Sequence, residues 1–305
     1  MSINLRRVRA FVTVARTRSI TEAAREMHMS PPAVTKSVRE LERTLAVELF
    51  HRTSSGMLLT PAGKAFQLHA ERALSEIEHG REEVALLMGG VGGRVAAGAT
   101  PEAAVGVLPI ALARVIDRRR QIELALVGGT FDSLAREVRT GALDFFLGIA
   151  PPDGVSGNLV AEPLYTEELQ VVARPGHPLA SRRLVTLADL IEFRWIQSAS
   201  HGPVADLMRR SFDEAGVALP SNTIIIEPLS PLRAVLQHTN LVAAATSVRM
   251  RDELDLGQLV ALPVPLPDTR LIVSIVRREE AYVSSWAKEL IVLLRRVARE
   301  IGAAV

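Results

Sequence analysis

The chain has 305 residues, of which 48% are hydrophobic and 23% charged, a balance typical of globular proteins with two or three domains. It contains no cysteine, which excludes disulfides and thiolate metal sites. No apolar run approaches the roughly 18 residues of a membrane-spanning helix, and the start of the chain lacks an apolar signal core. We therefore expect a cytoplasmic protein without a membrane partner.

Positive charge is concentrated near the start of the chain. Residues 1–60 hold ten Lys and Arg against five Asp and Glu, although the whole chain carries a net charge of only +2. A basic segment ahead of a mildly acidic remainder favours a polyanionic partner such as nucleic acid. On charge alone, a basic surface that merely contacts solvent explains the pattern equally well.

Two short helices are predicted first. Apolar residues recur at helical spacing over residues 4–17, which indicates a helix with one buried face. Ser19, followed three residues later by Glu22, is a capping box. The alanine-rich segment 21–27 behind it is predicted as a second helix that packs closely.

A third helix is predicted to begin at Ser30, because serine is a preferred cap and Pro31 suits the first helical position. Its apolar residues fall on one face. Thr35, Lys36 and Arg39 fall on another. This arrangement predicts one buried and one exposed polar flank.

Two strand-like pieces follow, residues 49–52 and 57–60, joined by the turn signal Ser54-Ser55-Gly56. Three short helices and a hairpin with a basic exposed face predict a winged helix-turn-helix over residues 1–60. In that arrangement the second helix of the pair enters the DNA major groove while the first braces it.

Residues 61–92 are predicted as a long linker helix followed by a break. Small and apolar residues recur every seven positions, at Phe66, Ala73, Gly80 and Leu87, with Ala70, Ile77 and Val84 between them. This repeat favours a coiled-coil-like seam with a partner helix. The alternative is an amphipathic helix packed on its own chain. The sequence MGGVGGR (88–94) marks the main domain boundary.

From residue 93 to 305 strand and helix patterns alternate, which predicts an α/β fold. Strands are expected at 94–99, 122–129, 144–150, 169–175, 194–198, 222–227, 241–246 and 271–278. Helices are expected from Pro101, up to Gly141, and over 203–216, 231–239 and 284–301. About 210 residues are many for one sheet, so two lobes joined by crossing strands are expected. We place lobe 1 at about 93–163 and 270–305, and lobe 2 at about 164–269.

Enzyme motifs are absent from the sequence. There is no Gly-x-Ser-x-Gly elbow, no phosphate-binding glycine loop ending in Gly-Lys, and no His-Glu-x-x-His. The seven histidines show no metal-ligand spacing. We expect no catalytic residue, no metal and no cofactor.

The segment SITEAAREMHMSPPAVTKSVRELERTLAVELFHRTSSGMLLTPAGKAF (19–66) resembles the N-terminal domain of LysR-type transcriptional regulators. The matching positions are ungapped: Ala23-Ala24, Ser30, Pro32-Ala33, Leu41-Glu42, Leu49-Phe50, Arg52, Leu59-Thr60 and Gly63. The length and order of the remainder also fit the family. The resemblance implies a winged helix-turn-helix, a long linker helix and a two-lobed effector domain similar to a periplasmic binding protein.

The resemblance implies DNA-binding residues in the third helix and at the start of the wing: Pro32, Thr35, Lys36, Arg39, Arg52 and Thr53. The alternative is an exposed helix face that only contacts solvent. For Arg52 the alternative is a structural contact with a carboxylate.

Three positions depart from the family pattern. Pro31 replaces a glutamine, and proline cannot read adenine through paired hydrogen bonds as a glutamine amide does. Thr35 replaces a serine, keeping the hydroxyl and adding a methyl suited to thymine. Lys36 replaces a frequent arginine and would read guanine with less defined geometry.

The second half contains three predicted helix starts, at Thr100-Pro101, 200–203 and Ser230-Pro231, whose amides and partial positive charge suit an anion. The resemblance places the effector in a cleft between the lobes and implies roles for Thr100, Thr130, Ser198, Ser200 and His201. Helix capping without a ligand explains each of these residues as well. The segment RWIQSASHGP (194–203) looks like that of relatives responding to aromatic acids or sulfonates, which favours a small organic anion.

Two functions remain as hypotheses. The first is a ligand-responsive regulator that binds dyad-symmetric promoter DNA as a homodimer or homotetramer through paired linker helices. The effector would favour one arrangement of subunits and so change DNA bending and contact with RNA polymerase. The second is an α/β enzyme or small-molecule carrier with an N-terminal interaction module.

Overall fold

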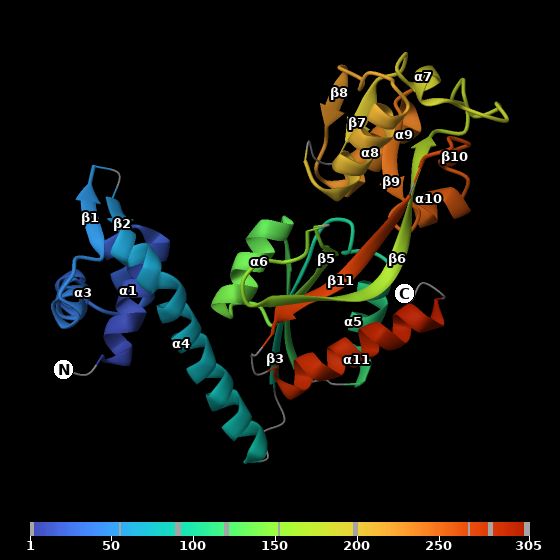
Figure 1. The fold of residues 1–305 in the computed structure, drawn as a ribbon. Coiled ribbons are helices and arrows are strands. Elements are labelled where there is room, and N and C mark those ends of the chain that lie inside the picture. Colours follow the sequence, from blue (N-terminus) through green and yellow to red (C-terminus); the bar gives the residue numbers. More distant parts are fainter. Residues whose placement is uncertain are drawn as a thin grey trace.

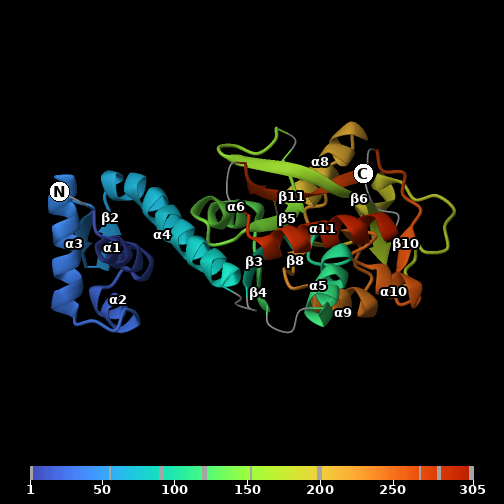
Figure 2. The same cartoon turned by 90° about the horizontal axis from the view of Figure 1, so that it is seen from below.

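The computed structural model describes residues 3–54, 56–88, 93–118, 122–151, 153–197, 201–267, 269–279 and 283–301. A small helical head, one long helix and a larger α/β body follow one another along the chain (Figure 1). Figure 2 shows the same three parts from below, with the long helix between head and body. Among the described residues no helix combines the length and the apolar character that crossing a membrane requires.

The head contains three helices and a hairpin: α1 (Leu5–Thr17), α2 (Ile20–Glu26), α3 (Pro31–Leu45), β1 (Phe50–Thr53) and β2 (Gly56–Leu59). Its core centres on Phe11, which is fully buried. The ring of Phe11 lies 5.3 Å from that of Phe50 and 5.2 Å from that of Phe66. These contacts join the first helix, the hairpin and the long helix, and the predicted winged helix-turn-helix is confirmed.

The long helix is α4 (Pro61–Leu87). Thr60 caps it, because its Oγ1 accepts a hydrogen bond from Gly63 N at 2.9 Å. Phe66 and Ala70 belong to the core of the head. Farther along, the seven-residue repeat lies at the surface: Ile77 is 49%, Val84 60% and Leu87 81% exposed.

The body is built on one seven-stranded sheet. Its strands are β3 (Gly93–Ala99), β4 (Ile122–Gly128), β5 (Phe145–Ile149), β6 (Leu159–Ala173), β9 (Ala243–Thr246), β10 (Val260–Leu262) and β11 (Arg270–Arg278). They run in the order β10-β6-β11-β5-β3-β4, with β9 also paired to β6. β6 and β11 are the long strands that extend from one lobe into the other (Figure 1). The predicted lobes joined by crossing strands are therefore present within a single sheet.

Lobe 1 is built on β3, β4 and β5, which are parallel to one another. Three helices pack on it: α5 (Val107–Arg118), α6 (Phe131–Thr140) and α11 (Ser285–Glu300). Alternate residues of β3 enter different cores: Val95 and Ala97 pack with α5 and α11, whereas Ala96 packs with α6. The sheet is thus covered on both faces.

Lobe 2 carries the remaining elements: α7 (Leu187–Leu190), β7 (Trp195–Gln197), α8 (Pro203–Glu214), β8 (Thr223–Ile225), α9 (Leu229–His238) and α10 (Arg251–Asp255). β7 and β8 pair in parallel. Trp195 and Phe212 pack edge to face with ring centroids 5.8 Å apart. The expected alternation of strand and helix is therefore confirmed here.

Two predicted helix starts are wrong. No helix begins at Pro101; residues 101–106 form turns and α5 begins at Val107. Gly106 has φ of +74°, which is outside right-handed helical geometry, and a Cβ there would lie 2.5 Å from Val248 Cγ1. The helix expected at Ser230-Pro231 begins earlier, at Leu229, with Pro228 as its N-cap.

Candidate DNA interface and effector site

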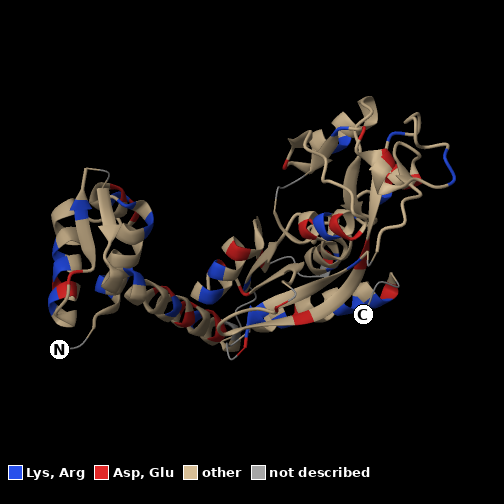
Figure 3. Ribbon diagram, turned by 45° about the horizontal axis from the view of Figure 1, so that its top comes forward, with Lys and Arg blue, Asp and Glu red and all other residues tan. Residues whose placement is uncertain are grey.

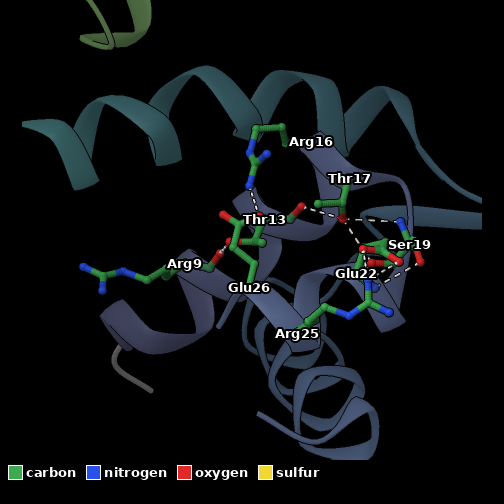
Figure 4. Close-up of polar contacts among 8 residues, drawn as sticks. All are labelled: Arg9, Thr13, Arg16, Thr17, Ser19, Glu22, Arg25 and Glu26. Carbon is green, nitrogen blue, oxygen red and sulfur yellow. Dashed lines mark hydrogen bonds and ion pairs between the residues drawn. The ribbon is translucent and has the colours of Figure 1, made fainter. Parts of the chain in front are cut away.

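The turn between α1 and α2 is held by a chain of hydroxyl contacts (Figure 4). Thr17 Oγ1 donates to Thr13 O at 2.9 Å, and Ser19 Oγ accepts from Glu22 N at 3.3 Å. The predicted capping box is only half formed, since the Glu22 carboxylate contacts the Arg25 guanidinium at 2.8 Å. Ion pairing with a nearby cation replaces the contact that Glu22 was expected to make with the backbone.

The start of α3 departs from the predicted cap. Ser30 is the N-cap, but its side chain accepts no capping hydrogen bond. Pro31 and Pro32 have no amide hydrogens to offer, and the next amide, on Ala33, donates to Ser30 O at 3.0 Å. The fixed φ of the two prolines, rather than a side-chain cap, therefore sets where this helix begins.

One flank of α3 is open to solvent. Pro32, Lys36 and Arg39 are exposed and Thr35 is half-buried, whereas Val34 and Val38 on the opposite side are buried. Positions three, four and seven apart share one helix face, so the four predicted residues lie together. Figure 3 shows basic residues along the head.

The Thr35 hydroxyl is already engaged. Its Oγ1 donates to Pro31 O, four residues earlier, at 3.0 Å. This bond orients the side chain and occupies its donor. The hydroxyl oxygen can still accept a hydrogen bond, and the methyl group remains for an apolar contact.

The wing is fixed against the helices by backbone contacts. Met57 N donates to Arg18 O at 2.9 Å, and a Cβ at Gly56 would lie 2.4 Å from that same oxygen. Glu42 Oε1 on α3 accepts from Leu49 N at 2.8 Å. The recognition flank and the wing are thus held at a set spacing.

Arg52 and Thr53, the predicted wing residues, are both exposed on β1. Arg52 forms no ion pair with a carboxylate of the described residues, so the structural role considered for it has no support there. Thr53 Oγ1 donates to Gly56 O at 3.0 Å and closes the hairpin.

In the body, the carboxyl ends of the parallel strands bring two predicted effector residues together. Thr100 follows β3 and Thr130 follows β4, and Gly129 N donates to Ala99 O at 3.3 Å. In sheets of this kind ligands bind beyond the carboxyl ends of the strands. Thr100 and Thr130 therefore share one edge.

These two threonines differ in their hydrogen bonds. Thr130 is exposed and caps α6, accepting from Ser133 N at 3.3 Å, as the capping alternative expects. Thr100 is 5% exposed, caps no helix, and its Oγ1 has no hydrogen-bond partner among the described residues. A buried hydroxyl without a partner is rare and costs free energy.

Of the other predicted effector residues, His201 is the one that the structure describes. His201 is exposed, just before Gly202, which is the N-cap of α8 as expected. It belongs to lobe 2, whereas Thr100 and Thr130 belong to lobe 1. Ser198 and Ser200 lie outside the described residues.

Sequence patterns gave no hint of a buried acid on β6. Glu167 is 1% exposed, and burial raises the pKa of its carboxyl, although the Thr246 and Tyr165 hydroxyls nearby lower it. Neither hydroxyl reaches normal hydrogen-bond geometry with the acid. Arg249 and Glu102 complete the charges around it. A buried carboxyl whose protonated form burial favours therefore lies on a strand that joins the lobes.

Comparison with known proteins decides the family. The model described as a bacterial regulatory helix-turn-helix protein of the lysR family matches residues 5–64, and the LysR substrate binding domain matches residues 88–299, more than half of the chain. The chain belongs to the LysR family of transcriptional regulators. It is a ligand-responsive, DNA-binding regulator, as the resemblance predicted.

Similar proteins cover nearly the whole chain. The transcriptional regulator GalR of Pseudomonas putida is 32% identical over 295 residues, 97% of this chain and 74% of that protein. PcaQ of Agrobacterium fabrum is 29% identical over 302 residues, 98% of this chain and 96% of that protein. Both are named transcriptional regulators rather than enzymes, which argues against the enzyme hypothesis.

Solved structures share the fold of this LysR-type regulator. Full-length OxyR from Pseudomonas aeruginosa superposes with a TM-score of 0.70 at 22% identity, covering 98% of this chain and 95% of that one. Full-length CbnR in complex with its target DNA gives a TM-score of 0.66 at 19% identity, covering 97% and 100%.

The sequence did not predict the structural roles of two residues in the LysR head, Glu42 and Gly56, which hold the hairpin against the helices. Glu42 was noted only as part of the family motif, yet its carboxylate ties α3 to the hairpin. Gly56 was noted as a turn signal, yet it is required because the wing approaches Arg18 O so closely. A carboxylate at the end of an amphipathic helix, just before a strand, is the signal that would have suggested the first role.

Proposed function

We propose that this LysR-type regulator reads dyad-symmetric promoter DNA in the cytoplasm with the exposed flank of α3, assisted by Arg52 and Thr53 on the wing. The observation that carries this proposal is the grouping of Pro32, Thr35, Lys36 and Arg39 on one face. The target DNA in the CbnR complex supports a duplex as the partner.

The test is a gel shift on the DNA upstream of the regulator's own gene. The variant Thr35→Ala/Lys36→Ala/Arg39→Ala is expected to lose sequence-specific binding and to show a salt dependence reduced by about one unit of slope per lost phosphate contact. Arg209→Ala/Arg210→Ala removes the same charge from lobe 2 and is expected to bind like the parent. Parent-like affinity of a folded triple variant would refute the assignment.

The proposed homo-oligomer is supported by surfaces that a single chain leaves exposed. Ile77, Val84 and Leu87 expose the seven-residue repeat of α4, and Ile116 (56%) on α5 and Leu126 (44%) on the edge strand β4 expose a second apolar area. We assign the first surface to a partner α4 and the second to side-by-side bodies, giving a dimer or a tetramer that contacts RNA polymerase. Val84→Glu is expected to lower the sedimentation coefficient, and Glu83→Gln is not.

The effector is proposed to be a small organic anion bound by Thr100 and Thr130 of lobe 1, and by Ser198, Ser200 and His201. The buried Thr100 hydroxyl without a partner supports this site. We propose residues 1–60, 61–92 and 93–305 as the head, linker and effector domains.

Thermal-shift screening of small organic acids against the 93–305 fragment tests the effector site. Thr100→Val is expected to abolish the stabilisation that an acid gives to the parent and to leave DNA binding of the full chain unchanged. An unchanged thermal shift in the valine variant would remove Thr100 from the site.

A further inference from the structure

A polar contact joins α4 to lobe 1 well away from both proposed binding surfaces. Ser75 Oγ donates to Gly141 O at 2.7 Å, and Glu76 pairs with Arg278 at 3.0 Å. His79 Nε2 lies 4.0 Å from the carboxylate of Asp144. We call these six residues the linker–lobe contact.

The contact is close and depends on a particular backbone. Gly141 has φ of +81°, and a Cβ there would lie 2.4 Å from Ser75 Oγ. The Arg278 side chain is only 4% exposed, and its charge is paired by a residue of the linker helix. Removal of the Glu76 carboxylate while α4 stays in place therefore leaves a buried charge without this partner.

The apolar surface of α4 contributes little to this contact. Ile77, Val84 and Leu87 are exposed, so hydrogen bonds and ion pairs hold the helix on the lobe. Polar interfaces between parts of one chain typically allow relative motion. The linker–lobe contact is thus suited to being made and broken, unlike the apolar packing of Phe66 in the head.

Two lobe 1 residues of the contact, Gly141 and Asp144, adjoin elements that also reach the proposed effector residues. Gly141 caps the C-terminus of α6, and Thr130 caps its N-terminus. Asp144 directly precedes β5, whose Leu147 O accepts from Thr100 N at 2.9 Å. α6 has ten residues, so its two caps lie about 15 Å apart along a stiff helix.

A second route reaches the same contact from lobe 2. Arg278 is the last residue of β11, and β11 pairs with β6 over both lobes, up to Leu271 beside Glu167. A change in the angle between the lobes must pass through these two strands. The effector edge and the strands that join the lobes are therefore both connected to the part of lobe 1 beside which α4 ends (Figure 2).

We propose that the linker–lobe contact transmits effector occupancy to the DNA-binding head, an inference that rests on the proposed function. Ligand contacts at Thr100 and Thr130 displace α6 and β5 slightly, and the opposite ends of these elements move Gly141 and Asp144 under α4. The contact then exists in two arrangements, and each places the head differently. Coupling of this kind typically changes affinity by about 5- to 150-fold.

Thermodynamic reciprocity gives a test that needs no effector. If effector binding at the lobe 1 edge alters DNA affinity through this contact, DNA binding must alter the lobe 1 edge through the same contact. The probe is a duplex that the full-length parent selects from a random-sequence library. The measurement is amide hydrogen exchange of residues 128–134, with and without that duplex.

In the parent we expect the duplex to change exchange at residues 128–134. In Ser75→Ala/Glu76→Gln we expect duplex binding to persist and that change to be lost. Glu83→Gln, on the exposed side of α4, is expected to behave like the parent. His79→Gln is a second, independent variant with the same expected loss should the double variant fail to fold.

Two results would overturn the proposal: a parent that binds the duplex without any change at residues 128–134, or contact variants that keep the change. Failure of the parent to select any duplex is a different result. It would refute the proposed function, and this inference with it.

Discussion

The two ends of α4 are attached in opposite ways. At the head, Phe66 and Ala70 enter an apolar core, where Phe11 contacts Phe66 edge to face. At the body, Ser75 and Glu76 make polar contacts with lobe 1. Burial of apolar surface is non-directional, whereas hydrogen bonds and ion pairs require particular distances and angles. We infer that α4 moves as one body with the head and separates more readily from lobe 1.

The largest expected effect is at the head. Phe11→Ala removes a fully buried ring that contacts both Phe50 and Phe66, and is expected to cost about 3–5 kcal/mol. Chemical denaturation followed by far-UV circular dichroism measures the loss. Leu68→Ala, at a position 36% exposed on α4, is the control and should cost much less. Equal costs would contradict the apolar attachment of α4 to the head.

A smaller effect is expected at the linker–lobe contact. Glu76→Gln leaves the buried Arg278 without its carboxylate, but Glu76 is itself 45% exposed, so solvent screens much of the loss. We expect destabilisation of about 1 kcal/mol. A double-mutant cycle with Arg278→Gln isolates the pair. A coupling energy as large as the cost of Phe11→Ala would show that α4 is held as strongly at lobe 1 as at the head.

Sequence reasoning succeeded where the relevant signals are local. The spacing of apolar residues in α1 and α3, the proline at position 31 and the turn before Gly56 each act within a few residues, and each predicted its element. The exposed flank of α3 followed from the same periodicity. At Pro101 the prediction failed, because α5 begins only after Gly106, which has φ of +74° and lies close to Val248.

The linker–lobe contact could not be predicted from local sequence signals. Ser75 and Gly141 are 66 positions apart, and nothing in either local sequence points to the other. The glycine was expected as the end of a helix, which is confirmed, yet its second role depends on where α4 lies in space. The burial of Glu167 likewise depends on strands far away in the sequence.

The pH dependence of the protein's stability tests the role of Asp144 in the linker–lobe contact. Burial raises the pKa of Asp144, against the lowering effects of the Ala96 amide, His79, Arg94 and Arg278. Between the ordinary carboxyl pKa of 3.8 and the raised value, the folded protein holds more protons than the unfolded chain. This contribution to stability is complete below that window and is lost as pH rises through the raised pKa.

Asp144→Asn removes this titration and retains an oxygen that accepts from Ala96 N. We therefore expect the fall in melting temperature with rising pH to be shallower in the variant than in the parent. Thermal unfolding from pH 4 upward measures the slopes. The control Asp132→Asn, at an exposed position of α6, should leave the slope unchanged. Parallel slopes for Asp144→Asn would show that this carboxyl is ionised normally.

The smallest expected effect lies on the DNA surface and should leave both ends of α4 intact. Because the Thr35 hydroxyl donates to Pro31 O, Thr35→Val keeps the methyl and should bind the selected duplex like the parent. Thr35→Ser loses the methyl and should weaken binding by about 0.8 kcal/mol, roughly fourfold. Replacing the contacted thymine by deoxyuridine should weaken the parent equally and Thr35→Ser no further, because the same methyl–methyl contact is removed from either side. Additive losses in this cycle would instead show that the two methyl groups do not contact each other, and weaker binding by Thr35→Val would show that the hydroxyl takes part in reading the base.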